Sequence, residues 1–93
     1  MRMDAIPVLL KIDGEGVADA LQEVREKLDD SQGKIVLDFS SVHHIDPHAL
    51  GAMEALAGTA DKKAIKVGLR GVNIDIYKVL KLAKLASRFS LLT

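Results

Sequence analysis

The chain has 93 residues, 13 basic and 13 acidic side chains, 3% aromatic residues and no cysteine. This length suits one small domain, residues 1–93, and the balanced charge and scarce aromatics disfavour nucleic-acid binding. The absence of cysteine excludes disulfides, a thiolate nucleophile and a cysteine-ligated zinc site. The apolar run at residues 5–10 is too short to span a membrane and has no signal-peptide pattern, so we expect a cytoplasmic protein without membrane insertion.

The first two predicted elements are a strand and an amphipathic helix. Residues 6–12 carry apolar side chains at every second position, which predicts a strand. The turn residues of the DGEG cluster at 13–16 follow, and a helix is predicted from there to about residue 30. Its apolar positions recur at spacings of four, three and four: Val17, Leu21, Val24 and Leu28. This spacing places one apolar stripe against a core.

A second strand and helix are predicted in the middle of the chain. Residues 35–39 are apolar and partly β-branched, which is typical of a strand covered on both faces. Asp46 followed by Pro47 marks a helix start, because aspartate caps a free backbone N–H and proline lacks the N–H that would stay unsatisfied. Small residues such as Gly51 are expected to let this helix approach the sheet closely. The predicted apolar stripe is Leu50, Met53, Leu56, Ala57 and Ala60.

The last third of the chain predicts a further strand at residues 65–69 and a helix capped by Asn73. We expect its apolar residues to face inward: Ile76, Val79, Leu80, Leu82, Ala83, Leu85 and Ala86. The tail at residues 87–93 is expected to dock as a short last strand, since exposed contiguous apolar residues lower solubility. The alternation of strands and helices predicts an α/β domain with a mixed or mostly parallel sheet of about four strands and three main helices.

Two segments in this order, IVLDFSSVHHIDPHALGAMEAL and KVGLRGVNIDIYKVLKLAKLASRF, resemble the STAS domain, a family named for sulfate transporters and anti-sigma factor antagonists. The matching positions are Leu37, Asp38, Phe39, Asp46, Leu50, Gly51, Gly71, Val72, Leu80 and Leu85. The resemblance implies a STAS-like single domain. It also implies a non-enzymatic regulatory protein-binding module of the anti-sigma factor antagonist type.

One position departs from the family pattern. In the switchable antagonists, the serine after the motif aspartate is phosphorylated by the partner kinase, and Pro47 stands at that position here. Proline has no hydroxyl to accept phosphate. The next two positions are His48 and Ala49 instead of the family's hydroxyl residue and glycine. The usual serine phosphoswitch is therefore absent from its usual place.

The predicted partner-binding surface is the turn before the second helix and the first turns of that helix. Its residues are His43, His44, Asp46, Pro47, His48 and Glu54. A rigid helix start offers preformed polar groups to a partner at little ordering cost. The resemblance implies that the partner is a regulatory protein, either an anti-sigma kinase or a related ATPase. It implies no cofactor, and it leaves both a monomer and a homodimer as alternatives.

Two alternatives accompany this interpretation. The segment RGVNIDIYKVLKLAKL also resembles a small STAS subunit bound to the ATPase of a lipid-transport ABC system. The second alternative is a metal site at the histidines, but His44 and His48 straddle the helix start and so do not share one helical face. No nucleophile with a base, carboxylate pocket or phosphate loop is found, so no enzymatic activity is predicted.

Overall fold

Strands and helices alternate along the chain, and the strands form one parallel sheet. The computed structural model describes residues 8–28 and 33–92. Its elements are β1 (Val8–Lys11), α1 (Val17–Glu26), β2 (Lys34–Asp38), α2 (Pro47–Lys62), β3 (Lys66–Arg70), α3 (Ile74–Leu82), a 3₁₀ turn η2 (Ala86–Arg88) and β4 (Ser90–Leu92). The sheet order is β1-β2-β3-β4, and each neighbouring pair is parallel. The predicted α/β class with four strands and three main helices is confirmed.

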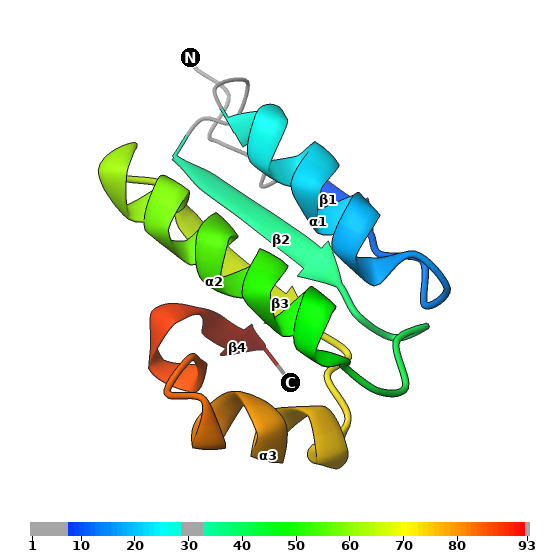
Figure 1. The fold of residues 1–93 in the computed structure, drawn as a ribbon. Coiled ribbons are helices and arrows are strands. Elements are labelled where there is room, and N and C mark those ends of the chain that lie inside the picture. The colour runs from blue at the N-terminus through cyan, green and yellow to red at the C-terminus, as the bar shows by residue number, and fades with distance from the viewer. Residues whose placement is uncertain (1–7, 29–32, 93) are drawn as a thin grey trace.

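The helices cover one face of the sheet. Because each helix connects two adjacent parallel strands, a right-handed crossover places every helix on the same side. Figure 1 shows α1 and α2 side by side across the sheet, with α3 toward the β4 edge. Alternate strand residues point at the helices and are buried, including Ile35, Leu37, Val67 and Leu69. These side chains and the apolar stripes of the helices form one core.

The predicted stripe of α2 is confirmed in its main members, since Met53 and Leu56 are fully buried and Ala57 and Ala60 nearly so. The expected role of Gly51 is wrong. This residue is exposed, and a methyl group added to it would meet no atom within 4 Å. The small residue that approaches the core is Ala49, which is 3% exposed.

The inward face predicted for the third helix is confirmed for Ile76, Leu80 and Leu85, which are buried. It is wrong for Leu82, which is 86% exposed. Successive helical residues are rotated by about 100°, so Leu82 lies about 200° around the axis from Leu80 and points outward. The helix also ends at Leu82, which places Leu85 in the following turn.

The ends of the predicted elements differ in part from the observed ones. The first strand is described from Val8, and the predicted residues 6–7 lie outside the described part of the chain, as do residues 29–32 near the predicted end of the first helix. The last regular residue of α1 is Glu26. The tail docks as predicted, because β4 pairs with β3. Across residues 8–28 and 33–92, no helix is long and apolar enough to cross a membrane.

Candidate functional site

Three loops meet at the edge where the parallel strands end. They are the β1–α1 loop at 12–16, the β2–α2 loop at 39–46 and the β3–α3 loop at 71–73. In parallel α/β sheets the carboxyl ends of the strands share one edge, and ligands bind in the crevices there. The β2–α2 loop lies between the other two because β2 lies between β1 and β3.

The β2–α2 loop is tied to the sheet at its beginning. The backbone N–H of Phe39 donates to the Arg70 carbonyl at 2.8 Å, which continues the ladder between β2 and β3. The N–H of Val42 then donates to the Phe39 carbonyl at 2.9 Å, which closes a turn. The Asp38 carboxylate accepts a hydrogen bond from the Ser40 N–H at 2.9 Å. These bonds give the loop a fixed backbone although Ser40 is exposed.

Glycines let the two neighbouring loops approach this central loop. A methyl group on Gly14 would overlap the Ser41 carbonyl oxygen, so only glycine allows the β1–α1 loop to come this close. On the other side, Gly71 has a φ of +73°, and a methyl group there would lie 3.0 Å from the Ser40 nitrogen. The central loop is therefore enclosed by backbone on both sides.

The Asn73 side chain links the β3–α3 loop to the β2–α2 loop by hydrogen bonds. Its Nδ2 lies 3.4 Å from both the Val42 and the His43 carbonyl oxygens, to which it donates. Its Oδ1 accepts from the Ile76 N–H at 2.9 Å and so caps α3, as predicted. One side chain thus couples the start of α3 to the segment that leads into α2.

The start of α2 has the geometry that the sequence predicts. The Asp46 carboxylate accepts from the Ala49 N–H at 2.7 Å, and Pro47 occupies the first turn. This cap removes one of the unsatisfied N–H groups that a helix start leaves. Asp46, Pro47 and His48 are exposed, so this rigid helix start faces solvent.

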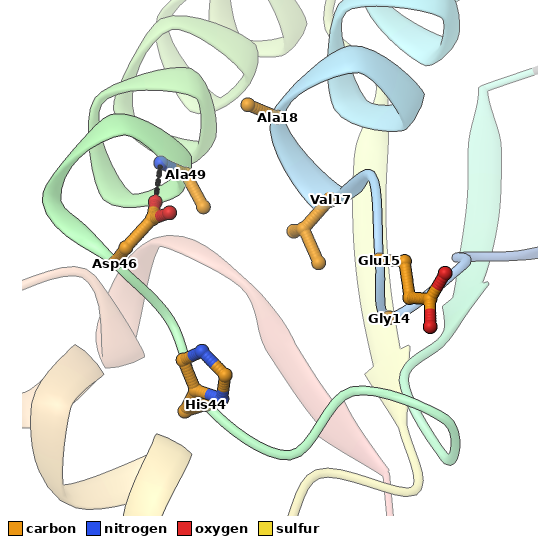
Figure 2. A pocket seen from close by; sticks show the side chains of 7 residues that line it. All are labelled: Gly14, Glu15, Val17, Ala18, His44, Asp46 and Ala49. Atoms are coloured by element: carbon orange, nitrogen blue, oxygen red, sulfur yellow. Dashed lines mark hydrogen bonds between the residues drawn. The ribbon is translucent and has the colours of Figure 1, made fainter.

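A pocket lies between the starts of α1 and α2, with a volume of about 370 Å³ (Figure 2). Its lining residues come from both loops and both helices: Gly14, Glu15, Val17, Ala18, His44, Asp46 and Ala49. Figure 2 shows His44 and Asp46 on one side and Glu15 on the other. Two carboxylates, those of Glu15 and Asp46, line this pocket together with the His44 imidazole, and the Asp46 carboxylate also accepts the capping hydrogen bond from Ala49.

The sequence interpretation missed Glu15 because it treated residues 13–16 as a turn only. The signal was available: two parallel strands that are neighbours in the sheet place their following loops side by side. Gly14 and Glu15 follow the first of these strands, and the predicted surface follows the second. Glu15 is exposed, and its N–H donates to the Asp13 carboxylate at 2.9 Å.

The structure brings the predicted surface residues together to different degrees. His44 and Asp46 line the pocket, while His43, Pro47 and His48 are exposed and do not line it. Glu54 is exposed two turns along α2, within about 20° of Pro47 when viewed down the helix axis. In the described ranges 8–28 and 33–92, no three histidine, aspartate or glutamate side chains form a group that could hold a metal ion.

Asp38 is expected to titrate below its ordinary value. The pKa of its carboxyl is lowered from 3.8, mainly by the Ser40 backbone hydrogen bond, then by the Ser40 side chain and by the charges of Arg70 and Lys11. A lowered folded pKa stabilises the protein above the unfolded value, and this contribution is lost as pH falls through the folded pKa. An NMR titration of the carboxyl carbon should therefore show a midpoint below 3.8. A midpoint at or above that value would contradict the observed hydrogen-bond pattern.

Removal of the Asp46 cap is expected to destabilise the protein. Asp46→Ala leaves the Ala49 N–H without its side-chain acceptor and should cost about 1 kcal/mol of unfolding free energy. Urea denaturation measures this loss. The matched control is Asp46→Asn, whose side-chain oxygen can still cap the helix, and its stability should stay within a few tenths of a kcal/mol of wild type. Equal losses in both variants would show that charge, and not the cap, matters.

Comparisons with known proteins agree with this geometry. The family model of the STAS domain matches residues 4–92, and the chain belongs to this family. No sufficiently similar sequence is found among curated proteins.

Solved structures show the same fold at low sequence identity. A proposed anti-sigma factor antagonist from Thermotoga maritima superposes with a TM-score of 0.70 at 22% identity, covering 92% of this chain and 74% of that one. An NMR structure of that same protein superposes with a TM-score of 0.74 at 19% identity, covering 99% of this chain and 90% of that one. A sulfate transporter family protein from Wolinella succinogenes superposes with a TM-score of 0.75 at 21% identity, covering 95% of this chain and 80% of that one.

Proposed function

We propose that this chain is a non-enzymatic regulatory module of the anti-sigma factor antagonist type that docks a protein partner through the start of α2. The docking surface, called the α2 start surface below, consists of His43, His44, Asp46, Pro47, His48 and Glu54. The partner is a regulatory protein, either an anti-sigma kinase or a related ATPase. The STAS family match and the antagonist among the structural neighbours support this class of partner.

The observation that carries the proposal is the rigid but exposed backbone of the α2 start. The Asp46 carboxylate accepts a hydrogen bond from the Ala49 N–H at 2.7 Å, which holds the helix start. The Asn73 side chain donates to the His43 carbonyl, which holds the preceding segment. A surface whose backbone is already ordered loses little entropy when a partner docks. A rigid docking site therefore needs no rearrangement of this chain.

The pocket beside this surface favours a basic group on the partner. Glu15 and Asp46 both line it, and the sign of their charge attracts a lysine or arginine side chain. Charged groups at an interface steer encounter and select partners more than they raise affinity. The pocket thus contributes specificity, while the exposed helix start contributes contact area.

Regulation at this surface does not use a serine phosphoswitch in this proposal. Pro47 stands in the first turn of α2 and has no hydroxyl. A phosphate at a helix start would be stabilised by free N–H groups, so the position is chemically suited to a switch that this chain lacks. Docking is then constitutive, or it is regulated at another site.

The docking surface can be tested without disturbing the fold. We expect Asp46→Asn and Glu15→Gln, which remove charge from the pocket, to weaken binding of the purified partner kinase or ATPase by about tenfold. Glu23→Gln on α1 is the matched control, because Glu23 is exposed and lies outside this pocket. Isothermal titration measures the affinities. If the pocket variants bind as tightly as the control, the partner docks elsewhere.

A further inference from the structure

The outer face of α3 carries an unusual concentration of exposed apolar side chains. Ile74 is 67% exposed, Tyr77 37% and Leu82 86%. Five large hydrophobic residues are exposed among residues 8–28 and 33–92, and three of them lie on this helix of nine residues. Scattered exposed apolar residues are ordinary, but a cluster on one face is typical of an interaction surface.

Lysines are interleaved with these apolar residues. At about 100° per residue, Ile74, Lys78 and Lys81 fall within about 60° of one another, with Tyr77 and Leu82 flanking them. Lys84 follows in the turn that ends the helix. Within the part of the chain that the structure describes, these lysines form no ion pair, whereas Arg88 is paired with Asp61 at 2.7 Å. Their charge is therefore available to a partner.

A groove adjoins this face. Its volume is about 530 Å³, and its lining residues are Tyr77, Lys81, Lys84, Ala86, Ser87 and Leu91. Ala86 and Leu91 are half-buried and the remaining lining residues are exposed. The groove thus offers apolar contact next to two unpaired lysines. None of these residues belongs to the α2 start surface.

The turn after α3 holds Lys84 beside the groove. The Leu85 N–H donates to the Leu80 carbonyl at 2.8 Å and the Lys84 N–H to the Lys81 carbonyl at 3.1 Å, which is a Schellman ending. Lys84 has a φ of +63° in this turn, a conformation that glycine adopts more easily. Ala64 has a φ of +57° in the equivalent turn after α2.

The charges and apolar side chains of this face favour some binding partners over others. Two α3 faces from two copies would place lysines against lysines, which is repulsive. The α1 helix of a second copy is acidic on its exposed side, but its apolar residues Val17, Leu21 and Val24 are buried in its own core. A flat lipid surface would not fill the groove. An acidic helix with an apolar stripe matches both the lysines and the groove.

We propose that the outer face of α3, with the groove beside it, is a second docking surface that binds an acidic amphipathic segment of a partner protein. Apolar side chains of the segment contact Ile74, Tyr77 and Leu82, and one enters the groove. Its carboxylates pair with Lys78, Lys81 and Lys84. This surface shares no residue with the α2 start surface, although the two adjoin where Asn73, next to Ile74, donates a hydrogen bond to the His43 carbonyl.

A designed peptide probes this proposal. The probe is a fluorescent amphipathic helix with leucine on one face and glutamate on the other, and the comparison peptide has lysine in place of each glutamate. Fluorescence anisotropy should show binding of the glutamate peptide only, and the binding should weaken as salt rises from about 0.05 to 0.5 M. Amide shifts in an NMR titration should concentrate on residues 74–92.

Two variants with matched controls separate binding from folding. Lys84→Gly removes a charge and relieves the positive φ, so it cannot weaken binding by unfolding the turn; Ala64→Gly is its control at the same backbone conformation. Leu82→Gln is paired with Leu9→Gln, since Leu9 is 52% exposed on β1. We expect about tenfold weaker binding for Lys84→Gly and Leu82→Gln, and unchanged binding for both controls.

Several results would overturn the proposal. They are the absence of peptide binding, equal binding of the two peptides, and equal affinities of Lys84→Gly and Ala64→Gly. Binding of the chain to vesicles of phosphatidylcholine and phosphatidylserine, without binding of the glutamate peptide, would assign the face to an anionic membrane instead. Because these residues lie outside the α2 start surface, failure here leaves the proposed function untouched.

Discussion

Replacement of Phe39 by alanine is expected to destabilise the protein by about 3–5 kcal/mol of unfolding free energy. Phe39 is fully buried at the point where β2 ends and the β2–α2 loop begins. Its side chain belongs to the core, and its removal leaves a cavity that a packed core fills only in part. Small domains have about 5–15 kcal/mol of stability in total, so this loss is a large fraction.

Urea denaturation followed by circular dichroism measures the change. Phe39→Leu is the conservative comparison and should lose less, about 1.5 kcal/mol or below. The comparison variant is Tyr77→Ala, since Tyr77 is an aromatic residue that is 37% exposed and should lose clearly less than Phe39, about 1 kcal/mol. A loss below about 1 kcal/mol for Phe39→Ala would show that the core does not depend on this ring.

Gly14→Ala is expected to have the second large effect, a loss of about 1–3 kcal/mol. The added methyl group would overlap the Ser41 carbonyl oxygen, and a backbone atom cannot move aside as a flexible side chain can. The β1–α1 loop must therefore separate from the β2–α2 loop. Since both loops line the pocket between α1 and α2, the substitution should also change the pocket and weaken partner docking.

Gly58→Ala is the matched control for this substitution. A methyl group on Gly58 would meet no atom within 4 Å, and Gly58 lies inside α2. Alanine loses less conformational entropy than glycine in a helix, so this variant should gain about 0.5–1 kcal/mol. Thermal unfolding of both variants tests the pair. If both substitutions shifted stability in the same direction, close backbone approach would not be the cause.

The sequence predicted the fold well because its signals were redundant. Apolar alternation located the first and third strands, a continuous apolar run located the second, helical spacing located the helices, and caps at Asp46 and Asn73 located two helix starts to the residue. The failures were local. Leu82 was assigned to the core because every apolar residue near the end of the third helix was treated as inward, whereas helical geometry turns Leu82 to solvent.

The site was harder to predict than the fold because it depends on contacts between separate loops. The sequence located the exposed residues around Asp46, but not the approach of Gly14 to Ser41 or the bridge from Asn73 to the His43 carbonyl. Such contacts join residues about 30 positions apart and leave no periodic pattern. On the outer face of α3, only Leu82 was assigned to the core, whereas Ile74 and Tyr77 received no assignment from the sequence.

In the proposed function, the α2 start docks a regulatory partner without a serine switch. The most direct measurement titrates the purified partner kinase into the chain with ATP or with a non-hydrolysable analogue, followed by mass spectrometry. Wild type should bind equally under both conditions and carry no phosphate on residues 46–51. Pro47→Ser should gain a phosphate and lose affinity only with ATP. Phosphate within residues 46–51 of wild type, or loss of its binding with ATP alone, would contradict the claim.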